Sequence, residues 1–231
     1  MQIEGSVALV TGANRGLGRH LAEELVRRGA AKVYAAARNA EQVTSGGVVP
    51  LRLDVNDPHS VAEAAAIASD VTVLVNNAGN GSSASLLDGP MDDIRAVMET
   101  HYFGALSVTR AFVPALRANA PSAILNIASV LSWTHPATFG PYCGAKAALW
   151  AQTDSVREEL AGSDIAVTAL HVGFIDTDMI AHIDVPKNDP RLIAAAAVDG
   201  VAAGAREVLA DDLTRLVRTS LGNSPAPTGA A

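Results

Sequence analysis

The chain contains 231 residues, of which 49% are hydrophobic, and it carries a formal net charge of -7 at pH 7. This length and apolar content suit one large domain with a sizeable core. The acidic balance argues against a nucleic-acid partner, because such binding needs clustered Lys and Arg. No apolar run approaches the ~18 residues of a membrane span, so we expect no membrane partner and a cytoplasmic location. The single cysteine, Cys143, excludes an intramolecular disulfide and a cysteine-based structural metal site.

The N-terminal segment predicts a strand, a glycine-rich turn, a helix and a second strand. Residues 6–10 form a valine-rich run, residues 19–28 show helical periodicity, and residues 31–37 form a second apolar run. Glycines in the turn let backbone N–H groups and a helix N-terminus approach a pyrophosphate closely, as in dinucleotide-binding folds. Their spacing is a variant of the common fingerprint, and a plain glycine-rich turn is the alternative. The turn reads Thr11-Gly12-Ala13-Asn14-Arg15-Gly16-Leu17-Gly18.

Arg38 follows the second strand, where an NAD site would be expected to place an acidic residue, about twenty positions past the glycines. Together with Arg15 in the glycine turn, Arg38 could hold the 2'-phosphate of NADP(H) through charge-assisted, bidentate contacts. The alternative is that both arginines simply face solvent. The pattern therefore favours NADP(H) as the cofactor.

Strand-like and helical patterns alternate along the rest of the chain. Further strands are predicted at residues 48–53, 71–75, 123–127 and 165–171, and helices at residues 58–69, 91–119, 139–160 and 192–210. Pro114 is expected to kink the helix at 91–119. The alternation predicts an α/β fold, a doubly wound parallel β-sheet of the Rossmann type with helices on both faces. We expect six strands and no seventh, a single domain over residues 1–223, and a mobile tail over residues 224–231.

Tyr142 and Lys146 lie four residues apart in the predicted helix at 139–160, so their phenol and ammonium groups share one face, one turn apart. Lowering a tyrosine pKa from about 10 toward neutrality requires roughly 4 kcal/mol in favour of the phenolate. The adjacent lysine, joined by a second cation, could supply that energy. Taken alone, the pair is also typical of a solvated helix face. The other motifs of the chain must therefore decide between a catalytic pair and a surface pair.

Several ordered motifs resemble the short-chain dehydrogenase/reductase family of single-domain NAD(P)-dependent oxidoreductases, and they cover nearly the whole chain. They are the glycine turn, Asp54, Asn76-Asn77-Ala78-Gly79, Ser129 thirteen residues before Tyr142, and Lys146. The resemblance implies that Tyr142 is the general acid/base, that Lys146 lowers its pKa and binds the nicotinamide ribose, and that Ser129 bonds the substrate carbonyl. It also implies the cofactor-binding set Gly12, Asn14, Arg15, Gly16, Leu17, Gly18, Arg38, Asp54, Val55, Asn76, Ala78, Gly79, Tyr142, Lys146, Gly173, Ile175 and Thr177.

His101 departs from the family pattern, which usually has an asparagine at this position of the long helix. That asparagine is thought to hold a water that links the lysine to solvent. His101 could relay the proton itself, because histidine titrates near neutrality, and the rate would then show an ionisation at about pH 6 to 7. It could instead break the relay, or merely pack inside the helix. A second departure, Val172 in place of the usual proline before Gly173, keeps the glycine and loses some rigidity.

We expect an NADP(H)-dependent carbonyl reductase or alcohol dehydrogenase that transfers a hydride between nicotinamide and the carbonyl or secondary alcohol of an apolar small molecule. Its substrate pocket would consist of Leu131, Trp133, Phe139, Met179, Ile180 and Ile183, although each alone also suits core packing. The alternative is a catalytically weak cofactor-sensing regulator on the same scaffold, which His101 weakly favours. No histidine pair has metal-ligand spacing, so we expect no metal. The family resemblance implies a homodimer or homotetramer, paired through the helices at 91–119 and 139–160.

Overall fold

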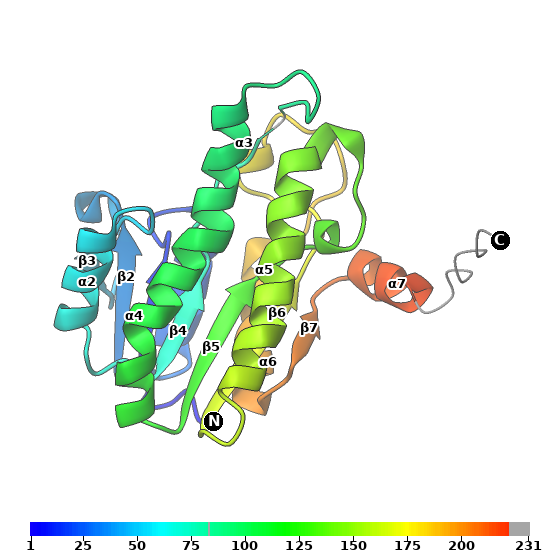
Figure 1. Cartoon of the computed structure of the whole chain (residues 1–231). Coiled ribbons are helices and arrows are strands. Elements are labelled where there is room, and N and C mark those ends of the chain that lie inside the picture. The colour runs from blue at the N-terminus through cyan, green and yellow to red at the C-terminus, as the bar shows by residue number, and fades with distance from the viewer. Residues whose placement is uncertain (83, 222–231) are drawn as a thin grey trace.

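Seven parallel strands form one sheet in this computed structural model, which describes residues 1–82 and 84–221 (Figure 1). The strands are β1 (Val7–Thr11), β2 (Lys32–Ala37), β3 (Val49–Arg52), β4 (Val73–Asn76), β5 (Ser122–Ile127), β6 (Ile165–His171) and β7 (Glu207–Leu209). Their order across the sheet is β3-β2-β1-β4-β5-β6-β7. The order reverses between β1 and β4, and ligands of such sheets bind outside the carboxyl ends of the strands at this switch point.

Helices cover both faces of the sheet, which confirms the predicted Rossmann-type architecture. Two of them, α1 and α6, pack on one face around Leu21, Ile193 and Val198. On the other face α2 and α4 bury Phe112 and Leu116, and Figure 1 shows α4 and α5 crossing that face side by side. The helices are α1 (Gly16–Arg27), α2 (Pro58–Ile67), α3 (Met91–Met98), α4 (Ala105–Ala118), α5 (Gly140–Glu159), α6 (Pro190–Ala203) and α7 (Asp212–Leu221), with short 3₁₀ turns at Ala40–Gln42, Val130–Ser132, Ala137–Phe139 and Asp178–Ile180.

The expectation of six strands and no seventh is wrong. The last predicted helix ends at Ala203 rather than near residue 210, because Gly204 adopts the left-handed conformation that commonly terminates helices, with φ of 65°. The chain then forms β7, whose Glu207, Val208 and Leu209 pair with the end of β6. All three residues of this edge strand are only half-buried. A strand this short shows no alternation of apolar and polar residues, so its sequence pattern does not reveal it.

The segment predicted as one long helix at 91–119 consists of α3 and α4 joined by a π-helical segment, Glu99–Gly104. The expected kink was assigned to Pro114, which lies inside α4. The π-helical segment lies nearer the carboxyl ends of the strands and contains His101. π-Helical turns inside α-helices occur often at functional sites.

Within the described residues no helix is both long and apolar enough to cross a membrane. The tail predicted at residues 224–231 lies outside the described residues, and the single domain at 1–223 stays a prediction.

Candidate active site

Two cavities lie at the carboxyl ends of the strands and share Tyr142 as a wall. We name them the glycine-loop cleft, about 760 Å³, and the apolar pocket, about 740 Å³. Ile127, at the end of β5, and Thr177, in the loop after β6, also line both cavities. A ligand in one cavity can therefore approach a ligand in the other across the tyrosine.

The glycine-loop cleft has the shape and the polarity that a pyrophosphate requires. A Cβ atom on Gly18 would lie 2.3 Å from the carbonyl oxygen of Gly12, so only glycine fits there. Gly12 itself has φ of 66°, a conformation that other residues rarely adopt. The first turn of α1 has no acidic residue, and Arg15 at its N-cap makes no side-chain capping bond. The N–H groups of this helix N-terminus are thus free to bind an anion.

The loop after β4 is fixed against the glycine turn by hydrogen bonds to Thr11. The Thr11 hydroxyl accepts from the backbone N–H groups of Asn77 and Ala78, each at 2.9 Å, and Asn77 Nδ2 donates to the Thr11 carbonyl at 2.8 Å. Asn76, which the sequence placed in the cofactor site, is buried beneath the cleft instead and donates to Asn126 at 2.8 Å. Asn77 lines the cleft in its place.

Most of the predicted cofactor residues line the glycine-loop cleft. Those that do are Gly12, Asn14, Arg15, Gly16, Leu17, Gly18, Arg38, Asp54, Val55, Ala78, Gly79, Tyr142, Lys146, Ile175 and Thr177. Gly173 does not, and it lines the apolar pocket. Residues that the sequence analysis missed include Asn39, Gln42, Asn56, Asn77 and Asn80. Each follows the carboxyl end of a strand, which was the available signal.

Helix α5 places Tyr142 and Lys146 one turn apart, as predicted, with Lys146 Nζ 5.4 Å from the centre of the tyrosine ring. Lys146 Nζ donates a 2.6 Å hydrogen bond to the carbonyl oxygen of Ile127. Burial lowers the pKa of Lys146 to about 7. Burial also raises the pKa of Tyr142, in the opposite direction to that expected from the lysine charge. The protein by itself therefore holds Tyr142 as a neutral phenol, which is a proton donor.

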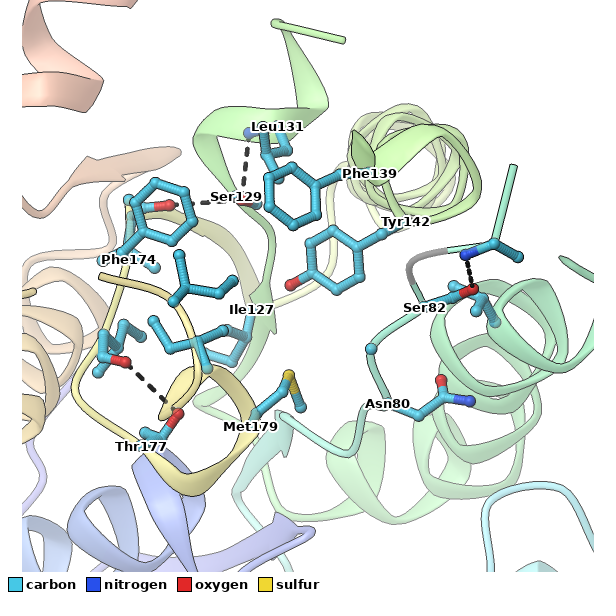
Figure 2. A pocket seen from close by; sticks show the side chains of 18 of the residues that line it. Asn80, Ser82, Ile127, Ser129, Leu131, Phe139, Tyr142, Phe174, Thr177 and Met179 are labelled. Carbon is cyan, nitrogen blue, oxygen red and sulfur yellow. Dashed lines mark hydrogen bonds between the residues drawn. The ribbon is translucent and has the colours of Figure 1, made fainter. Parts of the chain in front are cut away.

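Ser129 lies two residues after the end of β5 and caps the 3₁₀ turn that follows. Its hydroxyl accepts from the backbone N–H of Leu131 at 3.1 Å and donates weakly to the carbonyl of Val172 at 3.4 Å. The turn is tied to α5, because the Ser132 hydroxyl donates to the Lys146 carbonyl at 3.0 Å. Figure 2 shows Ser129 on the same wall as Tyr142, whose hydroxyl points into the apolar pocket.

His101 is a buried, neutral side chain beside Tyr142. Its Nε2 atom lies 2.8 Å from the carbonyl oxygen of Asn80, and the two rings meet edge-on with centroids 5.2 Å apart. A Cβ atom on Gly79 would lie 2.5 Å from the imidazole, so a glycine makes room for this histidine. Burial, helped by the charge of Lys146, lowers the pKa of His101 to about 3. With this pKa, an ionisation of His101 near pH 6 to 7 is not expected.

The apolar pocket contains five of the six predicted substrate residues, Leu131, Phe139, Met179, Ile180 and Ile183. Trp133 does not line it, because the turn after Ser129 directs the indole toward β6, where it stacks on His171 with ring centroids 3.9 Å apart. Phe174 and Asn80, which the sequence analysis missed, also line the pocket, as does Ile127 (Figure 2). The pocket is thus mainly aliphatic and aromatic, with Ser129 and Tyr142 as polar groups on one side.

The fold and this site together define a dinucleotide-dependent oxidoreductase, with an anion-binding glycine loop beside a Ser-Tyr-Lys constellation. The chain belongs to the short-chain dehydrogenase family, whose model, described as short chain dehydrogenase, matches residues 6–188. This match confirms the resemblance seen in the sequence motifs.

Individual relatives agree with the family assignment. A short chain dehydrogenase from Burkholderia cenocepacia, solved in complex with NADP, is 38% identical, with a TM-score of 0.93 over 97% of this chain and 95% of that chain. The 3-oxoacyl-(acyl-carrier-protein) reductase FabG of Salmonella typhimurium is 33% identical over 90% of this chain and 88% of its own. The 1-deoxy-11-beta-hydroxypentalenate dehydrogenase of Streptomyces exfoliatus is 30% identical over 96% of this chain and 82% of its own.

We expect His101→Asn to leave the pH profile of kcat unchanged between about pH 5 and 9, because the imidazole is already neutral throughout that range. The Asn amide can still donate toward the Asn80 carbonyl, whereas His101→Ala leaves that carbonyl unpaired and opens a cavity, so the Ala variant should unfold at lower temperature. Steady-state rates and thermal melts measure the two effects. Loss of an ionisation near pH 6 to 7 in the Asn variant would restore the relay hypothesis.

We expect Lys146→Met to abolish turnover and yet raise the free energy of unfolding at pH 6, by roughly 2 kcal/mol after the lost bond to Ile127 is subtracted. The folded-state pKa of about 7 lies below the ordinary value of 10.5, so the unfolded chain binds the proton more tightly. The cost of burying the ammonium is therefore complete below pH 7 and is lost as the pH rises toward 10.5. Urea denaturation at pH 6 and pH 10 should show a gain that shrinks at the higher pH.

Lys187→Met is the control, because it removes a lysine that is only half-buried, in the loop after β6. A gain in Lys146→Met that does not change with pH would argue against a buried ammonium as its source.

Proposed function

We propose that the protein is an NADP(H)-dependent reductase or dehydrogenase that interconverts a ketone and a secondary alcohol on an apolar skeleton. The observation that carries this proposal is the position of Tyr142, a half-buried neutral phenol at the wall shared by the glycine-loop cleft and the apolar pocket. A proton donor at that position serves a substrate in the pocket while a dinucleotide lies in the cleft.

Each residue of the constellation has a distinct task. The nicotinamide, when bound, supplies or accepts the hydride. Ser129 and Tyr142 line the pocket together and stabilise the negative charge that develops on the substrate oxygen, and Tyr142 then donates its proton to that oxygen. Lys146 lines the cleft, where its ammonium group can bond ribose hydroxyl groups and favour the resulting phenolate.

The preference for NADP(H) rests on the two arginines of the cleft. Arg15 and Arg38 both line it, both are exposed, and Arg38 follows β2 at the position where a carboxylate would suit a ribose hydroxyl. The relative from Burkholderia cenocepacia, which binds NADP, supports the same choice. Guanidinium groups match a 2'-phosphate by charge and by geometry.

The substrate proposed is a small molecule with an apolar body. Aliphatic and aromatic side chains form most of the pocket, and Asp93 is the one carboxylate among its described lining residues. Asp93 is exposed, so water screens its charge, and the apolar walls are the basis of this proposal. The relatives named for 3-oxoacyl and pentalenate substrates support a carbonyl or hydroxyl carbon on a largely hydrocarbon frame. The homo-oligomeric assembly and the cytoplasmic location stay predictions.

We expect Arg38→Asp to weaken NADPH binding about tenfold or more while leaving NADH binding equal or stronger, because it replaces an attractive charge by a repulsive one. Calorimetric titration with each cofactor measures the change without any substrate. Arg52→Asp is the matched control, since Arg52 lies opposite Ala37 in the β2–β3 pairing and does not line the cleft. Equal losses of affinity for both cofactors, or equal losses in both variants, would argue against binding of the 2'-phosphate by Arg38.

We expect Tyr142→Phe to keep NADPH affinity within about twofold and to lower the rate of NADPH oxidation on a panel of aromatic ketones by about a hundredfold or more, since only the proton donor is lost. Tyr102→Phe is the control, because Tyr102 lines neither cavity. Full activity in Tyr142→Phe would remove this residue from the mechanism. A wild-type protein that binds NADPH but oxidises none of it with any ketone would favour the cofactor-sensing regulator.

A further inference from the structure

The loop that leaves β6 and returns to α6 forms one side of the active site. It contributes Gly173, Phe174, Ile180 and Ile183 to the apolar pocket, and Thr177 to both cavities. The one short turn of 3₁₀ helix at Asp178–Ile180 is its main regular structure. The shape of this wall therefore depends on how the two ends of the loop are held.

The two ends of the loop are joined through Asn188. The Phe174 carbonyl oxygen accepts from the Asn188 backbone N–H at 2.8 Å and from its Nδ2 at 2.9 Å. The Asp176 N–H donates in return to the Asn188 carbonyl at 2.9 Å. Residues 175–187 thus form a closed flap on a narrow base.

Asp211, which lies between β7 and α7, binds this base and the C-terminal helix at once. One carboxylate oxygen accepts from the Gly173 N–H at 2.6 Å and from Asn188 Nδ2 at 2.8 Å. The other accepts from the Thr214 N–H at 2.7 Å, in the first turn of α7. Asp211 is 8% exposed, and all three partners are donors, so an ionised carboxylate suits this position.

We propose that Asp211 is a positioning residue that holds the flap at 175–187 against the active site, and thereby sets the affinity for the substrate. The assignment of the pocket to a substrate rests on the proposed function. The role of Asp211 in holding the flap, which we call the Asp211 clamp, rests on the hydrogen bonds alone. Two of the three charge-assisted bonds hold the base of the flap and the third anchors the carboxylate to α7, so their loss should open the flap before it unfolds the sheet.

An amide cannot replace this carboxylate. Asparagine has one acceptor oxygen and a donor NH₂ group, so Asp211→Asn can satisfy either Thr214 or the flap base, and it turns a donor toward the other. Asp212 is a matched neighbour: it is fully exposed, pairs with Arg215 at 2.8 Å, and begins α7 without contacting the flap. Comparing Asp211→Asn with Asp212→Asn therefore separates the loss of the hydrogen bonds to the flap from the effect of removing one negative charge.

Limited trypsin digestion tests the flap directly, because Lys187 lies in it beside Asn188. We expect cleavage after Lys187 to be about tenfold faster or more in Asp211→Asn than in Asp212→Asn or wild type, as lost bonds to a charged group open the segment. Asn188→Ala, which removes only the Nδ2 donor, should give an intermediate rate. Equal cleavage rates in the two aspartate variants would overturn the proposal, as would an acceleration spread over all tryptic sites, which reports global unfolding.

Kinetics with saturating NADPH supply the functional readout. In Asp211→Asn the KM for the best ketone should rise about tenfold, with a smaller change in kcat, because the wall is disordered while Ser129, Tyr142 and Lys146 stay in place. Asp212→Asn should keep both values. Faster cleavage after Lys187 with an unchanged KM would overturn the positioning role. If the protein reduces no ketone but still shows the difference in cleavage rate, the proposed function is contradicted and the role of Asp211 in holding the flap is supported.

Discussion

Burial of the Lys146 ammonium group is the constraint on which the rest of the active site depends. The residue is 4% exposed and gives a 2.6 Å hydrogen bond to the Ile127 carbonyl at the end of β5. Burying a charge costs roughly several kcal/mol, and the protein tolerates this cost because the sheet and α5 hold the cation in place. The same two elements carry Ser129 and Tyr142. The packing that buries Lys146 therefore also fixes the positions of Ser129 and Tyr142.

The elements with strong apolar patterns were predictable from the sequence, and those defined by tertiary fit were not. Strand β6 and helix α5 agree with prediction to within a residue at each end. The seventh strand, β7, escaped because it is a short, half-buried edge strand that follows a glycine hidden in an alanine-rich run. The π-helical segment at Glu99–Gly104 contains His101, whose ring packs against Gly79, and this long-range contact is not expressed in any local pattern.

The candidate site shows the same division. Residues after the strands were predictable because the parallel topology brings those ends together, and most of the cofactor set lines the cleft. Asn76 and Trp133 were misplaced because the direction of a side chain depends on the turn beneath it. In the protein without its cofactor, burial raises the pKa of Tyr142, an effect that the sequence cannot show because it reveals a neighbouring charge but not the depth of burial.

The chain has two tryptophans, and both lie in one cluster beside the active site. The Trp133 and Trp150 rings meet edge-on at 5.8 Å, His171 stacks on the first, and the guanidinium of Arg218 from α7 lies over both. His171 in turn contacts the Ser129 carbonyl oxygen at 3.2 Å. Indole emission from this protein therefore originates at a single junction of β6, α5 and α7. The molecule carries its own optical probe, which reports whether α7 is packed behind Ser129.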